Sequence, residues 1–222
     1  MCRKCHTELE IQQHVFTQCS TSRGLVTSRH NGVLKIIENH ILRHTNCKVS
    51  SDKPCIYTNS PLRVDLQIED IVNKNIFLID IKCPKDVTAN IERAHNMTKY
   101  SELRDHIAKI MPGWKVILNT FIVACFGSWV PNNNKILYNL GFKKITLSDC
   151  VKSNIKWSCE QWRFHQGLFS DHEITYSNIN STHFDYYKEN FYESDCQSDD
   201  GLDTLFETAK ESGLVPFVGK ND

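Results

Sequence analysis

Residues 1–22 contain four side chains whose spacing constrains the fold more than any other feature of the sequence. Cys2, Cys5, His14 and Cys19 follow the pattern C-x2-C-x8-H-x4-C. Thiolate and imidazole groups are the ligands that a structural zinc ion prefers, and four of them complete its tetrahedron. One tight turn can supply the C-x2-C pair, and one helical turn or loop can supply the other two ligands. We therefore predict that residues 1–22 form a small zinc knuckle.

The polar character of this segment favours a metal over a conventional core. Few apolar residues lie in it, so metal binding has to supply most of the folding free energy. His6 is an alternative fourth ligand, but a Cys–His pair adjacent in sequence has poorer geometry for one ion. Residues 2–6 also match C-x-x-C-H, the haem-attachment spacing, yet the sequence indicates neither an export route nor a haem pocket. A chance arrangement in a chain with ten cysteines is the other alternative.

The cysteines also bear on the cellular compartment. The sequence begins without the apolar stretch of a signal peptide. It contains no apolar run long enough to span a membrane, which takes about 18 residues. We therefore expect a reducing compartment, where metal binding by cysteine is more common than disulfide formation, and no membrane partner.

Charge is distributed unevenly along the chain, although its formal sum is zero. Residues 1–150 carry 20 Lys and Arg against 13 Asp and Glu, whereas residues 151–222 carry 6 against 13. A basic body with an acidic tail is typical of a polyanion-binding domain followed by a segment that does not touch the polyanion. Such an imbalance also arises by chance in many soluble proteins.

The spacing of apolar residues predicts an α/β core. Apolar residues recur at helical spacing from Ser28, which we expect to cap the helix, to about His44. The other expected elements are strands at Lys48–Ser50, Arg63–Ile68, Ile76–Ile79 and Trp114–Phe126, and helices at Thr88–Met111, Pro131–Leu140 and Leu147–His165. This order indicates a mixed sheet flanked by helices, in a domain spanning residues 26–166.

The composition changes after about residue 167. Aromatic residues alternate with acids there, and Asp195–Asp203 is acidic with Gly and Ser. Such a segment buries too little apolar surface to order itself. We expect residues 167–222 to be a mostly disordered, acidic tail with one short helix near Leu202–Ser212.

A second constellation surrounds the apolar run Ile76–Ile79. Asp80 and Lys82 follow this run directly, and Asp65 lies in the preceding predicted strand. If the two strands pair as a hairpin, Asp65 and Asp80 come close together. Two neighbouring carboxylates repel each other, so they are tolerated mainly when a divalent cation lies between them. Asp80 and Lys82 share one face of a strand because side chains alternate with period two.

Such a group of side chains suits the hydrolysis of a phosphodiester. Mg²⁺ polarises the phosphate and lowers the pKa of a bound water, while Lys82 orients or deprotonates that water and offsets developing charge. An acid-x-Lys tripeptide is common by chance, so a solvated strand end is the alternative interpretation. Glu38, on the first predicted helix, is either a supporting magnesium ligand or a solvated helix acid.

Together these features resemble the restriction-like endonuclease domain of R2-type non-LTR retrotransposons, within the PD-(D/E)xK nuclease superfamily. The resemblance covers roughly residues 2–165, and its motifs keep the family's order and spacing. After the Cys-Cys-His-Cys knuckle they are Arg29-His30-Asn31, Arg63-Val64-Asp65, Asp80-Ile81-Lys82-Cys83-Pro84, Lys99-Tyr100 and Gly127-Ser128-Trp129. Val64 stands where the family has proline, and the reverse-transcriptase domain of the family's polyprotein is not in this sequence.

The resemblance implies roles for particular residues. Asp65 and Asp80 would be magnesium ligands, Lys82 the catalytic lysine, and Lys99 an assisting or phosphate-holding residue. The nucleic-acid contacts would come from Arg29, His30 and Arg63. For His30, capping or packing of its helix is the alternative.

The resemblance also implies an activity, partners and a location. The family's endonuclease nicks target DNA, and the exposed 3′ end primes reverse transcription of the element's RNA. DNA, element RNA and a reverse-transcriptase domain would be the partners, and the nucleus the location.

Two other functions fit parts of the sequence. A decayed or domesticated copy of the element would bind nucleic acid through the knuckle and the basic body without cutting it. A protein-interaction module would use the knuckle as a structural staple and the aromatic, acidic tail as its contact surface. A series of salt concentrations distinguishes the last from the others, because phosphate contacts weaken steeply as salt rises.

Overall fold

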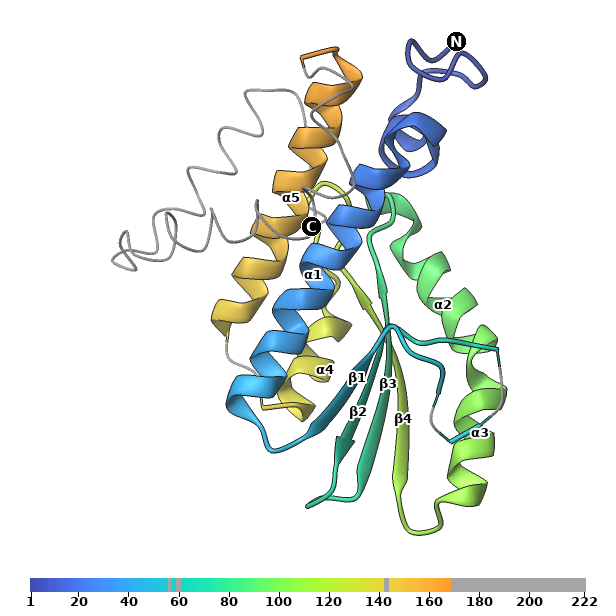
Figure 1. Ribbon diagram of the computed structural model, residues 1–222, viewed down its shortest axis with the longest axis vertical. Coiled ribbons are helices and arrows are strands. Elements are labelled where there is room, and N and C mark those ends of the chain that lie inside the picture. Colours follow the sequence, from blue (N-terminus) through green and yellow to red (C-terminus); the bar gives the residue numbers. More distant parts are fainter. Residues whose placement is uncertain (56, 59–60, 142–143, 169–222) are drawn as a thin grey trace, which may run out of the picture. The chain divides into compact units, whose positions relative to one another are not determined.

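A four-stranded mixed sheet lies at the centre of the fold (Figure 1). The strands, in sheet order, are β1 (Lys48–Ser51), β2 (Leu66–Asp70), β3 (Asn75–Lys82) and β4 (Lys115–Ile122). β2 pairs antiparallel with β1 and β3, whereas β3 and β4 are parallel. This computed structural model describes residues 1–55, 57–58, 61–141 and 144–168. The expected acidic tail, including the short helix near Leu202–Ser212, therefore lies outside the described residues.

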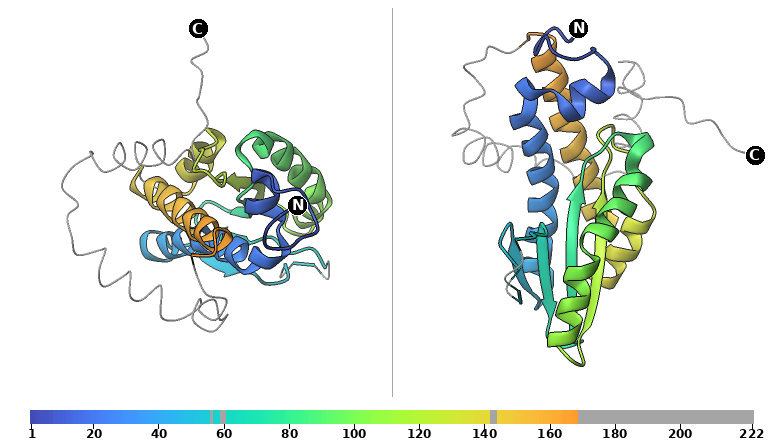
Figure 2. Two further views of the ribbon diagram at one scale, coloured as in Figure 1. Left: turned by 90° about the horizontal axis from the view of Figure 1, so that it is seen from above. Right: turned by 90° about the vertical axis from the view of Figure 1, so that its right-hand side faces the viewer.

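Helices cover both faces of the sheet. They are η1 (His14–Gln18), η2 (Ser20–Ser22), α1 (Arg23–His44), η3 (Asp86–Thr88), α2 (Ala89–Lys99), α3 (Ser101–Ile110), α4 (Asn132–Asn139) and α5 (Lys144–His165). α1, α4 and α5 lie on one side of the sheet and α2 and α3 on the other (Figures 1 and 2). The predicted α/β class, with a mixed sheet flanked by helices, is confirmed. None of the described helices is long and apolar enough to cross a membrane.

Alternation along β3 divides the core into two apolar clusters. Phe77, Ile79 and Ile81 belong to the cluster under α1, α4 and α5, whereas Ile76 and Leu78 belong to the cluster under α2 and α3. Each of the five is at most 1% exposed. The next side chains on the face of Ile76 and Leu78 are Asp80 and Lys82. The strand therefore carries its polar end to the side covered by α2.

Several elements begin or end away from the predicted residues. α1 starts at Arg23, so Ser28 is a buried residue inside the helix, and the prediction that it caps the helix is wrong. The long helix predicted at Thr88–Met111 is two helices, because Tyr100 leaves the helical range with φ −104° and ψ 5°. β2 begins at Leu66, three residues later than predicted, so Asp65 lies just before the strand.

Candidate functional site

The four predicted zinc ligands come together. Their ligand atoms all lie within 4.8 Å of one another. The Sγ atoms of Cys2 and Cys19 are 3.9 Å apart, and Cys5 Sγ lies 3.2 Å from His14 Nε2. Zn–S bonds of about 2.3 Å would set two thiolates of a tetrahedron about 3.8 Å apart. The cluster could therefore bind a metal such as zinc.

The structure distinguishes His14 from His6 as the fourth ligand. His14 is buried in η1, whereas His6 is exposed and has a positive φ of 57°. The backbone N–H of His6 donates to the carbonyl oxygen of Cys2 at 3.0 Å, which closes the turn that brings Cys2 and Cys5 together. His6 therefore shapes the turn, while His14 faces the thiols.

Hydrogen bonds and burial set the pKa values of two of these thiols in opposite directions. Thr7 Oγ1 donates to Cys5 Sγ at 3.2 Å, and with backbone N–H groups it lowers the pKa of Cys5 to about 5. Burial raises the pKa of Cys2. Cys5 is thus ready to act as a thiolate ligand, whereas Cys2 needs a cation to favour its ionised form.

The candidate metal-binding segment, residues 1–22, packs against α5 and is part of one compact unit, Met1–Leu168. The Phe16 and Trp162 rings stack with their centroids 6.0 Å apart. Gln161 Nε2 donates to the carbonyl oxygen of Val15 at 2.7 Å. The expected boundary near residue 22 therefore does not separate two independently packed domains.

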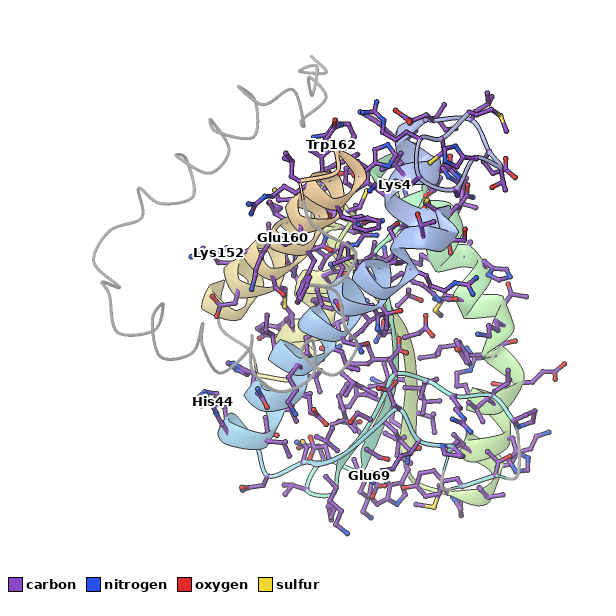
Figure 3. All side chains as sticks on the ribbon, turned by 45° about the horizontal axis from the view of Figure 1, so that its top comes forward. Lys4, His44, Glu69, Lys152, Glu160 and Trp162 are labelled. Atoms are coloured by element: carbon purple, nitrogen blue, oxygen red, sulfur yellow. The ribbon has the colours of Figure 1, made fainter. Side chains whose placement is uncertain are left out.

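Charged residues near the start of the chain extend this contact. Arg3 Nη1 donates to Gln166 Oε1 at 3.0 Å, and Lys4 Nζ lies 4.5 Å from the centroid of the Phe164 ring. Figure 3 shows Lys4 and Trp162 at the same end of the structure, with His44 at the far end of α1. The first and last parts of the unit are thus held together by polar as well as aromatic contacts.

Arg29 is a buried link between the metal-binding segment and the core. Its side chain is 0% exposed. It donates to the carbonyl oxygen of Phe16 at 2.6 Å, and to Ser158 Oγ and Gln161 Oε1 at 3.1 Å each. Burial lowers its pKa, yet a guanidinium stays charged in proteins. Its side chain is thus enclosed among α1, α5 and η1 and is not exposed for the predicted contact with nucleic acid.

We expect Arg29→Met to destabilise the protein by about 2–4 kcal/mol, because three buried acceptors lose their donor. Denaturant unfolding followed by circular dichroism measures the change. Arg104→Met is the matched control, since the Arg104 side chain is 38% exposed and pairs with Asp105 at the surface. The control should stay within about 0.5 kcal/mol of the unaltered chain. Equal stability of the two variants would show that Arg29 does not hold the segment in place.

The carboxylate–lysine constellation converges where β3 ends. The β2–β3 register pairs Leu66 with Ile79, and one further step sets Asp65 opposite Asp80. Lys82 Nζ lies 3.2 Å from Asp80 Oδ2, which confirms that the two side chains share a face. Asp80 is 3% exposed, whereas the Lys82 side chain is 34% exposed. The lysine therefore extends from a buried carboxylate toward solvent.

α2 and the junction that follows it supply two further partners of Asp80. Asn96 Nδ2 donates to Asp80 Oδ2 at 2.5 Å, and the Tyr100 hydroxyl lies 2.8 Å from Asp80 Oδ1. Lys99 Nζ is 2.9 Å from the same hydroxyl, so Lys99 reaches Asp80 through Tyr100. Burial and the charge of Asp80 raise the pKa of Tyr100, which keeps its phenol protonated. Asn96 was not predicted as a site residue. Its spacing of four residues from Tyr100, which sets both on one face of the predicted helix, is the sequence signal that could have indicated it.

Asp65 is held by β3 and by α1. Its Oδ2 accepts the backbone N–H of Ile81 at 2.5 Å and lies 3.2 Å from His30 Nε2. Burial lowers the pKa of His30, but its hydrogen bond to Asp65 and the charge of Asp65 outweigh this, and the pKa is raised overall. His30 therefore packs against the candidate site as a partner of its carboxylate.

Glu38 has partners of its own. Its Oε1 accepts from the Ser51 hydroxyl at 2.5 Å, and its Oε2 pairs with Lys35 Nζ at 2.9 Å. Within the described residues, Glu38, Asp65 and Asp80 are not among the groups of three or more side chains that could share a metal ion. The structure thus does not bring Glu38 to the two aspartates, which the interpretation of Glu38 as a supporting magnesium ligand requires.

Asp65 and Asp80 could hold a divalent cation only if one partner of Asp80 moved. Mg²⁺ usually takes one or two carboxylates and keeps several waters, so this pair would suffice without Glu38. The oxygens of Asp80, however, already face Asn96, Tyr100 and Lys82. Lys82 is the partner with a partly exposed side chain, and its ammonium would have to move for a cation to enter.

Arg63 and Lys99 lie at the exposed rim of this group. The Tyr100 hydroxyl is 2.8 Å from the carbonyl oxygen of Arg63, which places Arg63 beside Asp80. Both Arg63 and Lys99 are exposed residues. Their positive charges are therefore available to an anionic ligand.

No protein-family model matches this chain, and no curated protein matches it significantly.

Proposed function

We propose that this chain is the DNA endonuclease module of an R2-type non-LTR retrotransposon, which nicks one strand of DNA by magnesium-dependent hydrolysis. The observation that carries this proposal is the meeting of Asp65, Asp80 and Lys82 at one end of the sheet. The mixed sheet flanked by helices agrees with the architecture that the resemblance to restriction-like nucleases implies. Action on chromosomal DNA would place the protein in the nucleus.

Each side chain would have a distinct task. Magnesium held by Asp65 and Asp80 would supply Lewis-acid polarisation of the scissile phosphate. Lys82 would hold the attacking water and offset the charge that develops on the phosphate oxygens. Asn96 and Tyr100 would fix the orientation of the Asp80 carboxylate, as partners of metal ligands commonly do.

DNA would be held by charges around this centre. Arg63 and Lys99 are exposed beside it, and residues 1–150 carry an excess of basic side chains. The Cys-Cys-His-Cys cluster would help to bind DNA or the element's RNA. These contacts are electrostatic, so binding should weaken steeply as salt rises.

The proposal predicts that the chain converts supercoiled plasmid to open circles in Mg²⁺. Cutting of one strand gives open circles before linear DNA, and gel electrophoresis separates the forms. Leaving out Mg²⁺ should stop the reaction, because the carboxylates then lack their cation. DNA that is bound but stays supercoiled over a range of Mg²⁺ concentrations would rule out the endonuclease.

A second candidate function is nucleic-acid binding without hydrolysis, by a decayed or domesticated copy of the element. The observation that favours it is the set of donors around Asp80, in which the Lys82 ammonium already pairs with the carboxylate. Such a chain would bind DNA with a steep salt dependence and leave the plasmid intact. A shallow salt dependence would instead favour a protein-interaction module.

A further inference from the structure

Arg93, on α2, carries a positive charge into the fold without a hydrogen-bond partner for two of its nitrogens. Its Nε and Nη2 are buried and have no partner within the described part of the chain. Burial lowers the pKa of Arg93, yet a guanidinium stays charged in proteins. A buried, unpaired charge destabilises the fold unless an anion or another acceptor compensates it.

Arg93 lies on the part of α2 that covers the candidate site. It precedes Asn96 by three residues, so the two side chains lie one turn apart on neighbouring parts of the helix surface. Asn96 contacts Asp80. α2 runs back along β3 (Figure 1), so the turn that precedes Asn96 lies toward the end of the strand where Lys82 stands.

β4 adds a second unpaired polar group on the same face of the sheet. Thr120 is in register with Asp80 on the neighbouring parallel strand, so both side chains point toward α2. Thr120 is 1% exposed, and its Oγ1 has no hydrogen-bond partner among the residues that the structure describes. α2 packs directly against β4. Two unsatisfied hydrogen-bonding groups thus lie on the layer that holds Asp80.

We propose that Arg93 and Thr120 form an anion site that binds a phosphate group beside Asp80 and Lys82. Nε and Nη2 lie on one edge of the guanidinium plane, and their parallel N–H groups match two oxygens of one phosphate. The Thr120 hydroxyl can donate to a further oxygen. Arg93 as a whole is half-buried, so the site would lie at the border between the core and the solvent.

The inference rests on the proposed function only for the identity of the molecule that carries this phosphate. The ligand would be a backbone phosphate of the DNA strand that is cut, next to the scissile one. Binding there would align the strand with Lys82. Arg93 would be a positioning residue, because it holds a neighbouring phosphate and not the reacting atoms.

Inorganic phosphate is a probe that tests the site without DNA cleavage. Phosphate should raise the Tm of the full chain above its value in chloride of the same ionic strength, because it binds the folded form. Arg93→Gln should lose most of this rise in Tm. Arg93→Lys should keep part of the rise, since lysine retains the positive charge but not the two parallel N–H groups. Arg104→Gln, which alters a partly exposed arginine on α3, should respond like the unaltered chain.

The Tm without phosphate separates a binding role from a structural one. Arg93→Gln removes a buried, unpaired charge, so its Tm in chloride should equal or exceed that of the unaltered chain. A fall of more than about 4 °C, which corresponds to roughly 1 kcal/mol in a chain of this size, would assign Arg93 a structural role and overturn the proposal.

DNA binding without added Mg²⁺, over a series of salt concentrations, gives an independent measurement. Loss of one phosphate contact should reduce the slope of log K against log salt by about 0.9 in Arg93→Gln. If Arg93→Gln keeps both the salt slope of the unaltered chain and its full rise in Tm with phosphate, the anion site is overturned, even if the unaltered chain nicks plasmid. If the rise in Tm with phosphate depends on Arg93 but the unaltered chain does not nick plasmid, the anion site is supported and the endonuclease is rejected.

Discussion

Asp80→Asn should slow plasmid nicking at saturating Mg²⁺ by at least about 100-fold, since changes even in the partners of metal ligands cost 10–100-fold. The substitution keeps the size of the side chain but removes the charge that pairs with Lys82 at 3.2 Å. An amide also offers only one acceptor oxygen where Asn96 and Tyr100 contact two. Both the proposed magnesium ligand and its supporting hydrogen bonds are altered.

Asp70→Asn is the matched control for this experiment. Asp70 ends β2 near the β2–β3 turn, where its carboxylate accepts hydrogen bonds from Asn73 at 3.0 and 2.6 Å. This variant should nick at the unaltered rate, and both variants should keep their circular dichroism spectra. Nicking by Asp80→Asn at the rate of the Asp70→Asn control would remove Asp80 from the active site.

Cys19→Ser should give the largest loss of stability, because it breaks a four-ligand cluster. Structural zinc contributes about 10–16 kcal/mol to the folding of isolated zinc-finger peptides at pH 7. In this chain the segment also carries Phe16, which packs on Trp162 of α5. We expect bound zinc to fall well below about one equivalent per chain. We also expect the Tm to drop by about 10 °C or more.

Cys159→Ser is the control that separates the effect of losing a metal ligand from the effect of replacing a cysteine elsewhere in the chain. Cys159 is a half-buried residue of α5 outside the cluster. Elemental analysis should find unaltered zinc in this control, and its thermal melt should lie within a few degrees of the unaltered chain. A full equivalent of zinc in Cys19→Ser would mean that another residue takes its place, and the four-ligand assignment would be wrong.

Local patterns in the sequence predicted the parts of the site that lie on β3 and in the metal-binding segment. The run Ile76–Ile79 marks a strand buried on both faces, and period-two alternation then places Asp80 and Lys82 together. The spacing of the four Cys and His residues predicted their cluster, because the C-x2-C and H-x4-C spacings each bring two of these side chains together locally. In both cases neighbours in sequence carry the information.

The remaining features depend on which helix packs on which face, and local patterns do not reveal this. The buried donor Arg29 finds its acceptors Ser158 and Gln161 at separations of 129 and 132 residues. In the sequence, Asn96 is one of many polar residues in a predicted exposed helix. Its contact with Asp80 becomes apparent only when the position of α2 relative to β3 is known. Tyr100 separates α2 from α3 where the sequence predicts one helix, and its hydroxyl lies 2.8 Å from Asp80 Oδ1 on the sheet.

The contacts between Val15 and Gln161, and between Arg3 and Gln166, have a consequence for biosynthesis. The first of them joins residues 146 positions apart. At 5–20 residues per second, the ribosome needs on the order of 10 s to make the chain between the two partners. During this interval the N-terminal thiols have emerged but their docking helix has not. Early capture of zinc would shield them from oxidation and mispairing until α5 arrives.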